Sequence, residues 1–189
     1  MLNLDFAKQV VIDTNAQDWL ASPAAGVWRK PLARNDEILG HVTSIVKYEA
    51  GSKFAEHEHP MGEEIFVLEG IFSDETGDYG KGSYLRNPPG SRHAPYSDQG
   101  CIIFVKLNQF DDRDLKQVRT PTDTAQWQQG IGGLEVMPLH DFEHEHVALV
   151  KWPANETFQS HRHFGGEEIL VLSGTFQDEH GRYPVNTWI

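Results

Sequence analysis

Two histidines and a glutamate lie close together in the stretch His57-Glu-His-Pro-Met-Gly-Glu63. Alternate residues of a β-strand point to the same face, so a strand here would project His57 and His59 side by side. The turn-forming residues that follow would bring the chain back, so that Glu63 faces the imidazoles and Glu64 faces away. Two imidazoles and a carboxylate suit divalent transition metals such as zinc, iron, manganese, nickel or copper.

A third histidine, His93, follows the turn-forming run Asn87-Pro-Pro-Gly-Ser-Arg. Such a run leads from one extended segment into the next, and it would let His93 approach the same set of side chains. We therefore expect His93 to supply a fourth ligand. The alternative is that all four side chains lie at strand ends on a solvated surface, but the repeat described next weighs against it.

The chain contains an internal repeat with an offset of 104 residues. Residues 57–75 return as residues 161–179, with the same His-x-His pair, the same Glu-Glu pair and the same Val-Leu-x-Gly run. Repeats of this kind mark repeated structural units. We predict a first unit at residues 1–107 that includes an N-terminal extension, a polar connecting segment at 108–129, and a second unit at 130–189.

The repeat also duplicates most of the candidate ligands. Three residues of the second unit match the first three ligands, namely His161, His163 and Glu167. Ile189 corresponds to Leu85, so the second unit contains no counterpart of His93. Either the chain is truncated at this end or the second unit borrows a strand. A site with three ligands and an open position and a site without metal both fit this pattern.

The spacing of apolar residues predicts strands rather than helices. Residues 64–68 and 101–107 are short runs rich in β-branched and aromatic residues, bounded by glycine, proline, asparagine and aspartate. We expect helix only briefly, near residues 14–21. Many short strands joined by turns predict an all-β sandwich, jelly roll or barrel.

Two stretches of the first unit resemble the two cupin sequence motifs. Residues 51–70 read G-x5-H-x-H-x3-E-x6-G, and residues 82–93 read G-x5-P-x-G-x2-H, with Ser97 in place of the usual final asparagine. The chain is similar to the ChrR-type cupin domain, which is found in zinc-binding anti-sigma factors. The resemblance implies a cupin double-stranded β-helix, or jelly-roll barrel, built as two tandem units, the second incomplete at its C-terminal end.

In the ChrR-type family, three histidines and one glutamate hold zinc in the barrel. The resemblance therefore implies zinc at the positions His57, His59, Glu63 and His93, with Fe, Mn and Ni as alternatives. It also implies a sensor or regulator of a transcriptional stress response. Related cupins include oxygen-dependent enzymes, so the alternative is an Fe(II)-dependent dioxygenase acting on a small dicarbonyl or aromatic ketone. A third hypothesis is a storage module that binds a small molecule without turnover.

The resemblance also bears on partners. It implies a small-molecule ligand at the metal and a protein partner such as a sigma factor. ChrR anti-sigma factors hold the sigma factor with a separate helical domain, and this sequence shows neither that domain nor a Cys-x-x-Cys motif, which weighs against a sigma factor. An unfinished second unit would leave an exposed edge strand, so we also expect a homodimer.

Composition narrows the class of protein. The formal net charge is −12, which disfavours nucleic acid and anionic membrane surfaces as partners. No apolar run approaches the ~20 residues of a membrane span, and no signal peptide is visible. The single cysteine, Cys101, rules out an internal disulfide and, with these features, predicts a cytoplasmic protein. Because Cys101 lies in an apolar run, we expect a buried and unreactive thiol.

Several charged residues near the candidate ligands are expected on the surface. Strand alternation turns Glu64 away from the ligands, and its repeat counterpart Glu168 likewise, so we expect both to form surface ion pairs. Arg86 and Arg92 could orient an anionic ligand, but surface placement is the simpler expectation. The pair Asp74-Glu75 is interpreted as part of a turn.

Overall fold

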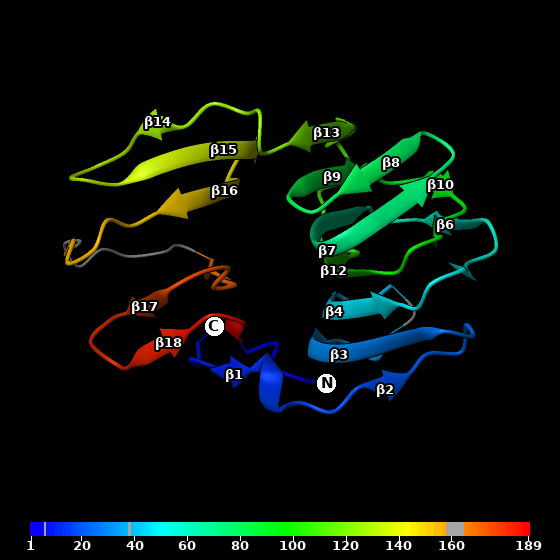
Figure 1. Ribbon diagram of the computed structural model, residues 1–189, viewed down its shortest axis with the longest axis horizontal. Coiled ribbons are helices and arrows are strands. Elements are labelled where there is room, and N and C mark those ends of the chain that lie inside the picture. Colours follow the sequence, from blue (N-terminus) through cyan, green and yellow to red (C-terminus); the bar gives the residue numbers. More distant parts are fainter. Residues whose placement is uncertain (6, 38, 158–164) are drawn as a thin grey trace.

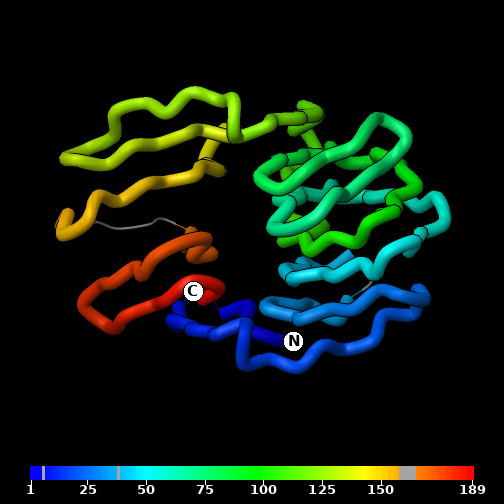
Figure 2. The backbone as a smooth tube through the Cα atoms, in the orientation of Figure 1, coloured from blue at the N-terminus to red at the C-terminus, as the bar shows by residue number. Residues whose placement is uncertain are grey.

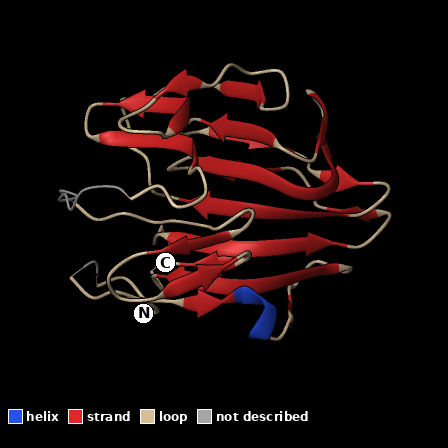
Figure 3. Cartoon of the chain, turned by 60° about the vertical axis from the view of Figure 1, so that its left-hand side comes forward, coloured by secondary structure: helices blue, strands red, loops and turns tan. Residues whose placement is uncertain are grey.

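The computed structural model describes residues 1–189 except 6, 38 and 158–164. This part of the chain is almost entirely β-structure with one short 3-10 helix, as Figures 1 and 3 show. The elements are β1 (Ile12–Asp13), η1 (Thr14–Ala16), β2 (Leu20–Ala21), β3 (Val27–Arg34), β4 (Val42–Tyr48), β5 (Ser52–Lys53), β6 (His57–His59), β7 (Glu63–Asp74), β8 (Gly77–Gly80), β9 (Ser83–Asn87), β10 (Ser91–His93), β11 (Tyr96–Ser97), β12 (Cys101–Leu107), β13 (Val118–Pro121), β14 (Gln128–Gln129), β15 (Glu135–Phe142), β16 (Glu145–Lys151), β17 (Thr175–Gln177), β18 (Arg182–Pro184) and β19 (Thr187–Trp188). The expected all-β class is confirmed.

The main sheet of the first unit has the strand order β13-β9-β7-β12-β4-β3-β2. Its central strand, β12, pairs antiparallel with both β4 and β7. Cys101, Ile103 and Val105 point into the core of the first unit, whereas Ile102 and Phe104 pack in a second cluster on the opposite face. A strand covered on both faces needs apolar residues at nearly every position. The expected burial of Cys101 is confirmed, and burial raises the pKa of its thiol to about 11.

The internal repeat is also a repeat of strand pairing. In the first unit, Ile65 on β7 lies opposite Leu85 on β9. In the second unit, Ile169 and Ile189 exchange backbone hydrogen bonds of 3.0 and 2.9 Å at the corresponding positions. The hairpin β17–β18 likewise matches the hairpin β7–β8 in register. The two units therefore share one architecture.

The second unit is more open than the first, because its repeat ends before the counterpart of β12. Val46 on β4 lies beside β12 and is 4% exposed, whereas its counterpart Val150 on β16 is 46% exposed. Among the strands that the structure describes, β16 pairs with β15 alone. In the part of the chain that the structure describes, the second unit is therefore less enclosed than the first, and its incompleteness at the C-terminal end stays a prediction.

The N-terminal segment packs against both units. On the first unit, Leu2 exchanges backbone hydrogen bonds with Arg34 on β3, and Lys30 donates to the carbonyl oxygen of Thr14. Strand β1 pairs with β19, with Ile12 opposite Trp188, and Thr14 donates backbone and side-chain hydrogen bonds to the carbonyl oxygen of Asn186 at 3.0 and 2.8 Å. Figure 2 shows both ends of the chain in the lower half of the view. The second unit thus borrows a strand from the N-terminal extension. The helix expected near residues 14–21 is limited to η1, because the chain then turns extended and forms β2.

The segment between the units contributes to the first unit's sheet. Residues 118–121 form β13, which pairs antiparallel with β9, so that Val118 lies opposite Arg86 and Arg119 opposite Leu85. Proline is tolerated at the end of an edge strand because no neighbour needs its missing N–H, and Pro121 occupies that position. The connecting segment is therefore part of the structure that supports β9.

A buried cluster of charged side chains joins the two units. The Arg86 guanidinium donates to Asp114 at 2.8 Å and to both carboxylate oxygens of Glu145 on β16 at 2.9 and 3.1 Å. Asp114 also lies 2.7 Å from Nε2 of His140 on β15. Glu64 lies 3.9 Å from Arg86 on the same side. We refer to these five residues as the inter-unit network.

The expected surface positions of Glu64 and Arg86 are wrong. Strand alternation does turn both side chains away from the core of the first unit, but the second unit covers that face, and the Arg86 side chain is 0% exposed. Burial raises the pKa of Glu64. Glu168 is also largely buried and pairs with Lys106 at 2.5 Å. Arg92, by contrast, is exposed as expected.

We expect Arg86→Ala to destabilise the fold strongly, because Asp114 and Glu145 would lose their cationic partner. Removing one member of a buried ion pair typically costs about 3–5 kcal/mol. Urea unfolding followed by tryptophan fluorescence would measure this loss in the free energy of unfolding.

The matched control is Arg92→Ala, which removes the same side chain from an exposed ion pair with Glu58. Exposed pairs contribute about 0–1 kcal/mol, so this variant should unfold almost as the wild type does. A loss for Arg86→Ala no larger than that of the control would contradict a stabilising inter-unit network.

Candidate metal centre

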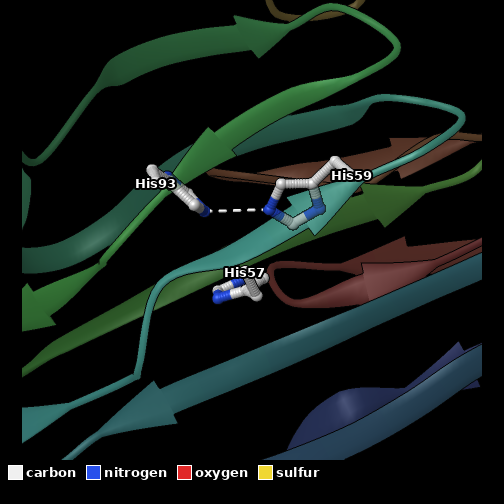
Figure 4. A group of neighbouring side chains, drawn as sticks. All are labelled: His57, His59 and His93. Atoms are coloured by element: carbon white, nitrogen blue, oxygen red, sulfur yellow. Dashed lines mark hydrogen bonds between the residues drawn. The ribbon is translucent and has the colours of Figure 1, made fainter.

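Three histidines converge at one end of the first unit. His57 and His59 lie on β6, and His93 lies on β10, which pairs antiparallel with β6 so that His57 is directly opposite His93. One nitrogen of each ring lies within 4.8 Å of the others. The Nε2 atoms of His59 and His93 are 2.9 Å apart, as Figure 4 shows. The side chains that the spacing predicts to form one set are therefore neighbours in space.

A tight turn between β6 and β7 brings Glu63 beside the histidines. Gly62 has a φ of +80°, and a Cβ atom there would come within 1.7 Å of the Phe110 ring, so only glycine fits. Oε2 of Glu63 then lies 3.4 Å from Nε2 of His59 and 3.3 Å from Nε2 of His93. The carboxylate at the start of β7 therefore faces the imidazoles.

The site is buried, and burial sets the charge of His59. His59, Glu63 and His93 are 6%, 6% and 4% exposed, and His57 is half-buried. Burial lowers the pKa of His59, although the nearby Glu63 carboxylate acts in the opposite direction. A neutral imidazole keeps the lone pair that a metal ion requires. Burial therefore favours the neutral form of His59, which is the form that can bind a metal ion.

His93 differs from His59 because it has a carboxylate partner on its other nitrogen. Burial alone would lower the pKa of His93, but the hydrogen bond with Asp74 and the charge of Glu63 outweigh it and raise this pKa. Oδ2 of Asp74 lies 3.5 Å from Nδ1 of His93. Burial would raise the pKa of Asp74, but hydrogen bonds with His93 and Thr76 lower it to about 2. Asp74 thus holds Nδ1, and Nε2 points toward His59.

The remaining candidate ligands also have fixed orientations. Asn87 donates a hydrogen bond of 2.9 Å to Oε2 of Glu63, and Nδ1 of His57 lies 2.9 Å from the carbonyl oxygen of Ala55. Sequence reasoning missed the roles of Asn87 and Asp74, which it interpreted as turn residues. No motif position identifies them, because their contacts depend on how β7, β9 and β10 lie together.

The donor set fits a divalent transition metal. Three imidazole nitrogens and a carboxylate are usual ligands of zinc and iron. Hydrogen bonds to the other nitrogen of a ligating histidine orient the ring and tune its basicity, and such partners are present here for His57 and His93. Within the described residues, the group of His57, His59 and His93 is the one with three potential ligands this close together.

The second predicted ligand set is only partly described. His161 and His163 lie outside the described residues, and Glu167 is exposed. Metal binding in the second unit therefore stays a prediction.

Two β-rich units in tandem, with histidines gathered at the end of one of them, define a duplicated cupin. The chain belongs to the ChrR Cupin-like domain family, whose sequence model matches residues 7–111 and again residues 115–189. These two matches confirm both the resemblance to the ChrR-type cupin domain and the tandem arrangement.

Several solved structures are similar to this chain. A putative dioxygenase from Nostoc punctiforme has a TM-score of 0.69 and 16% identity, and the match covers 95% of this chain and 73% of that chain. The complex of Rhodobacter sphaeroides SigE with the anti-sigma ChrR has a TM-score of 0.43 and 23% identity, and the match covers 50% of this chain and 51% of that chain. A putative acetylacetone dioxygenase from Methylibium petroleiphilum has a TM-score of 0.49 and 22% identity, and the match covers 60% of this chain and 90% of that chain. At 16% identity, the likeness to the Nostoc punctiforme structure shows the fold alone.

The match with the SigE–ChrR structure spans about half of each chain. Comparison with curated protein sequences gave no match. In the part of the chain that the structure describes, no helix has the length and apolar character needed to cross a membrane.

We expect Asp74→Asn to weaken metal binding about 10- to 100-fold, the usual effect of removing the partner of a ligating histidine. The neutral amide would leave His93 without a carboxylate at Nδ1. Competition with a chromogenic chelator would measure the affinity.

The control is Glu69→Gln, which removes one negative charge from an exposed position on the same strand. Its metal affinity should equal that of the wild type. Equal affinities for both variants would show that Asp74 does not support the site.

Proposed function

We propose that this protein binds zinc through His57, His59, Glu63 and His93 and acts as a metal-dependent sensor or regulator. The observation that carries the proposal is the buried convergence of the three histidines on Glu63, whose Oε2 lies 3.3 and 3.4 Å from two imidazole nitrogens. Four protein ligands suit tetrahedral zinc. When bound, the metal would supply Lewis acidity, and the chain would supply a fixed arrangement of ligands around it.

Membership of the ChrR Cupin-like domain family supports a sensing role. The position of β7 and β9 between the metal site and the second unit also supports a sensing role. Glu63 and Asn87 face the metal site, while their sequence neighbours Glu64 and Arg86 belong to the inter-unit network on the other side of the same strands. A change in ligation that moved β7 or β9 would therefore reach the contact between the units. The proposal includes a protein partner whose binding depends on the arrangement of the two units at this contact. The homodimer stays a prediction.

An Fe(II)-dependent dioxygenase is the second candidate, and an aromatic wall beside the histidines favours it. The Phe54 ring lies 5.7 Å from the His57 ring, and the Phe72 ring lies 6.2 Å from the His93 ring. Tyr48 packs edge-on against both phenylalanines. Such a surface suits a small dicarbonyl or aromatic ketone placed next to a metal.

We expect protein purified without added metal to contain at least one equivalent of zinc per chain, and His59→Ala and Glu63→Gln to contain much less. Because metal binds the folded state, these variants should lose thermal stability together with the metal. Ligand at 100 times its dissociation constant stabilises by about 2.7 kcal/mol. Elemental analysis and differential scanning calorimetry, with and without chelator, would measure both effects.

His146→Ala is the control, because this histidine is exposed and lies in the second unit. It should keep the metal content and the response to chelator. If His59→Ala and Glu63→Gln also keep a full complement of metal, the assigned ligands are wrong. A second equivalent in the wild type would indicate that the second unit binds metal as well.

Oxygen consumption separates the two candidates. For a zinc sensor we expect no oxygen uptake by the iron-reconstituted protein with a panel of small dicarbonyls and aromatic ketones. Cleavage by a dioxygenase would consume one O₂ per substrate and place both oxygen atoms in the two carbonyl products. Uptake in this ratio that is lost in His59→Ala would favour the enzyme over the sensor.

A further inference from the structure

Arg119 reaches the metal centre from outside both cupin motifs. It lies on β13, in the segment between the two units, and its side chain is 22% exposed. Nη2 donates to Oδ1 of Asn87 at 2.7 Å, Nε donates to the hydroxyl of Tyr79 at 3.1 Å, and Nη1 donates to the carbonyl oxygen of Arg86 at 3.1 Å. The guanidinium is therefore held from three directions.

The contact with Arg119 fixes which way the Asn87 amide points. An asparagine side chain offers a carbonyl oxygen on one side and an NH₂ group on the other, and its partners decide between the two orientations. Because Arg119 can only donate, the oxygen of Asn87 must face it, and the NH₂ group must face Glu63. That group donates to Oε2 of Glu63 at 2.9 Å. Asn87 is 3% exposed, so water has little access to replace either contact.

The same guanidinium also stands beside the partner of His93. Nη2 of Arg119 lies 3.9 Å from Oδ2 of Asp74, the oxygen that faces Nδ1 of His93. Arg119 thus contacts the hydrogen-bond partners of two candidate ligands: Asn87, which donates to Glu63, and Asp74, which faces His93. Lysine would replace it only in part, because a single ammonium group keeps the charge but lacks the planar fork that reaches several acceptors at once.

Strand pairing determines where Arg119 lies. Val118 is opposite Arg86 and Arg119 is opposite Leu85, so Arg119 lies on the face of β9 that bears Leu85 and Asn87. A shift of β13 by one residue would turn the guanidinium to the other face. Thr122 anchors the end of the strand by donating from Oγ1 to the carbonyl oxygen of Gly82 at 2.5 Å.

We propose that Arg119 is a positioning residue of the metal site: by holding Asn87 and Asp74, it orients Glu63 and His93 for the metal. This inference rests on the proposed function, because it requires that these residues bind a metal. The proposal gives the segment between the units a role at the metal site, although this segment lies outside the two cupin sequence motifs.

The test compares Arg119→Met and Arg119→Lys with the wild type, using cobalt(II) as a spectroscopic probe and zinc in chelator competition. We expect Arg119→Met to weaken zinc binding at least 10-fold, the lower end of the usual effect of an outer partner. The visible absorption of bound cobalt should also change, because its intensity and position report ligand geometry. Arg119→Lys should recover part of the affinity.

Val118→Ala is the matched control for a purely structural effect. Val118 lies next to Arg119 on β13 and packs in an apolar cluster with Tyr84 and Met137, so the substitution should weaken the strand and keep the guanidinium. We expect a lower unfolding midpoint in the metal-free protein, with zinc affinity within about twofold of the wild type. The reason is that the substitution trims only the Val118 side chain and keeps the backbone carbonyl oxygen to which Nη1 of Arg119 donates at 2.8 Å.

A double-mutant cycle tests whether Arg119 affects zinc affinity by orienting Asn87. Arg119→Met should cost much less affinity in an Asn87→Ala background than in the wild type, because the group that Arg119 orients is already absent. Unchanged zinc affinity and cobalt spectrum in Arg119→Met would overturn the positioning role while the metal site stands. If wild-type protein shows no metal binding that depends on His59, the proposed function fails, and this inference fails with it.

Discussion

The antiparallel pairing of β7 with β9 is the constraint on which the rest of the structure depends. Successive residues of a strand point to opposite faces, so this pair of strands presents Glu63 and Asn87 on one side and Glu64 and Arg86 on the other. One side completes the candidate metal centre, and the other forms the buried contact with the second unit. The metal-facing and unit-facing surfaces therefore share one backbone, and neither can shift independently.

Much of this arrangement follows from local patterns in the sequence. The repeat and the two motifs predicted the tandem cupin fold, and the i, i+2 spacing predicted that His57 and His59 would project together. Strand alternation also predicted that Glu63 rather than Glu64 would face the histidines. These predictions succeed because each depends on geometry within a few residues or on a comparison of the chain with itself.

The parts that were not predictable depend on contacts between distant elements. Arg86 was expected at the surface because alternation shows which way a side chain points but not what covers it, and here β15 and β16 cover it. Asp74, Asn87 and Arg119 meet only after β7, β9 and β13 have paired. Their residue types are common in turns and at surfaces, so nothing in a single sequence separates them from ordinary polar residues.

The pairing of β1 with β19 makes the order of folding unequal for the two units. All the strands of the first unit's main sheet except β13 lie within the first 107 residues, so its core can form while the chain is still being synthesised. Strand β1, although it is made before all of these strands, has no strand partner until β19 emerges. Closing a loop of nearly the whole chain costs entropy before any contact is gained. The second unit is therefore completed last, on the surface of a first unit that is already folded.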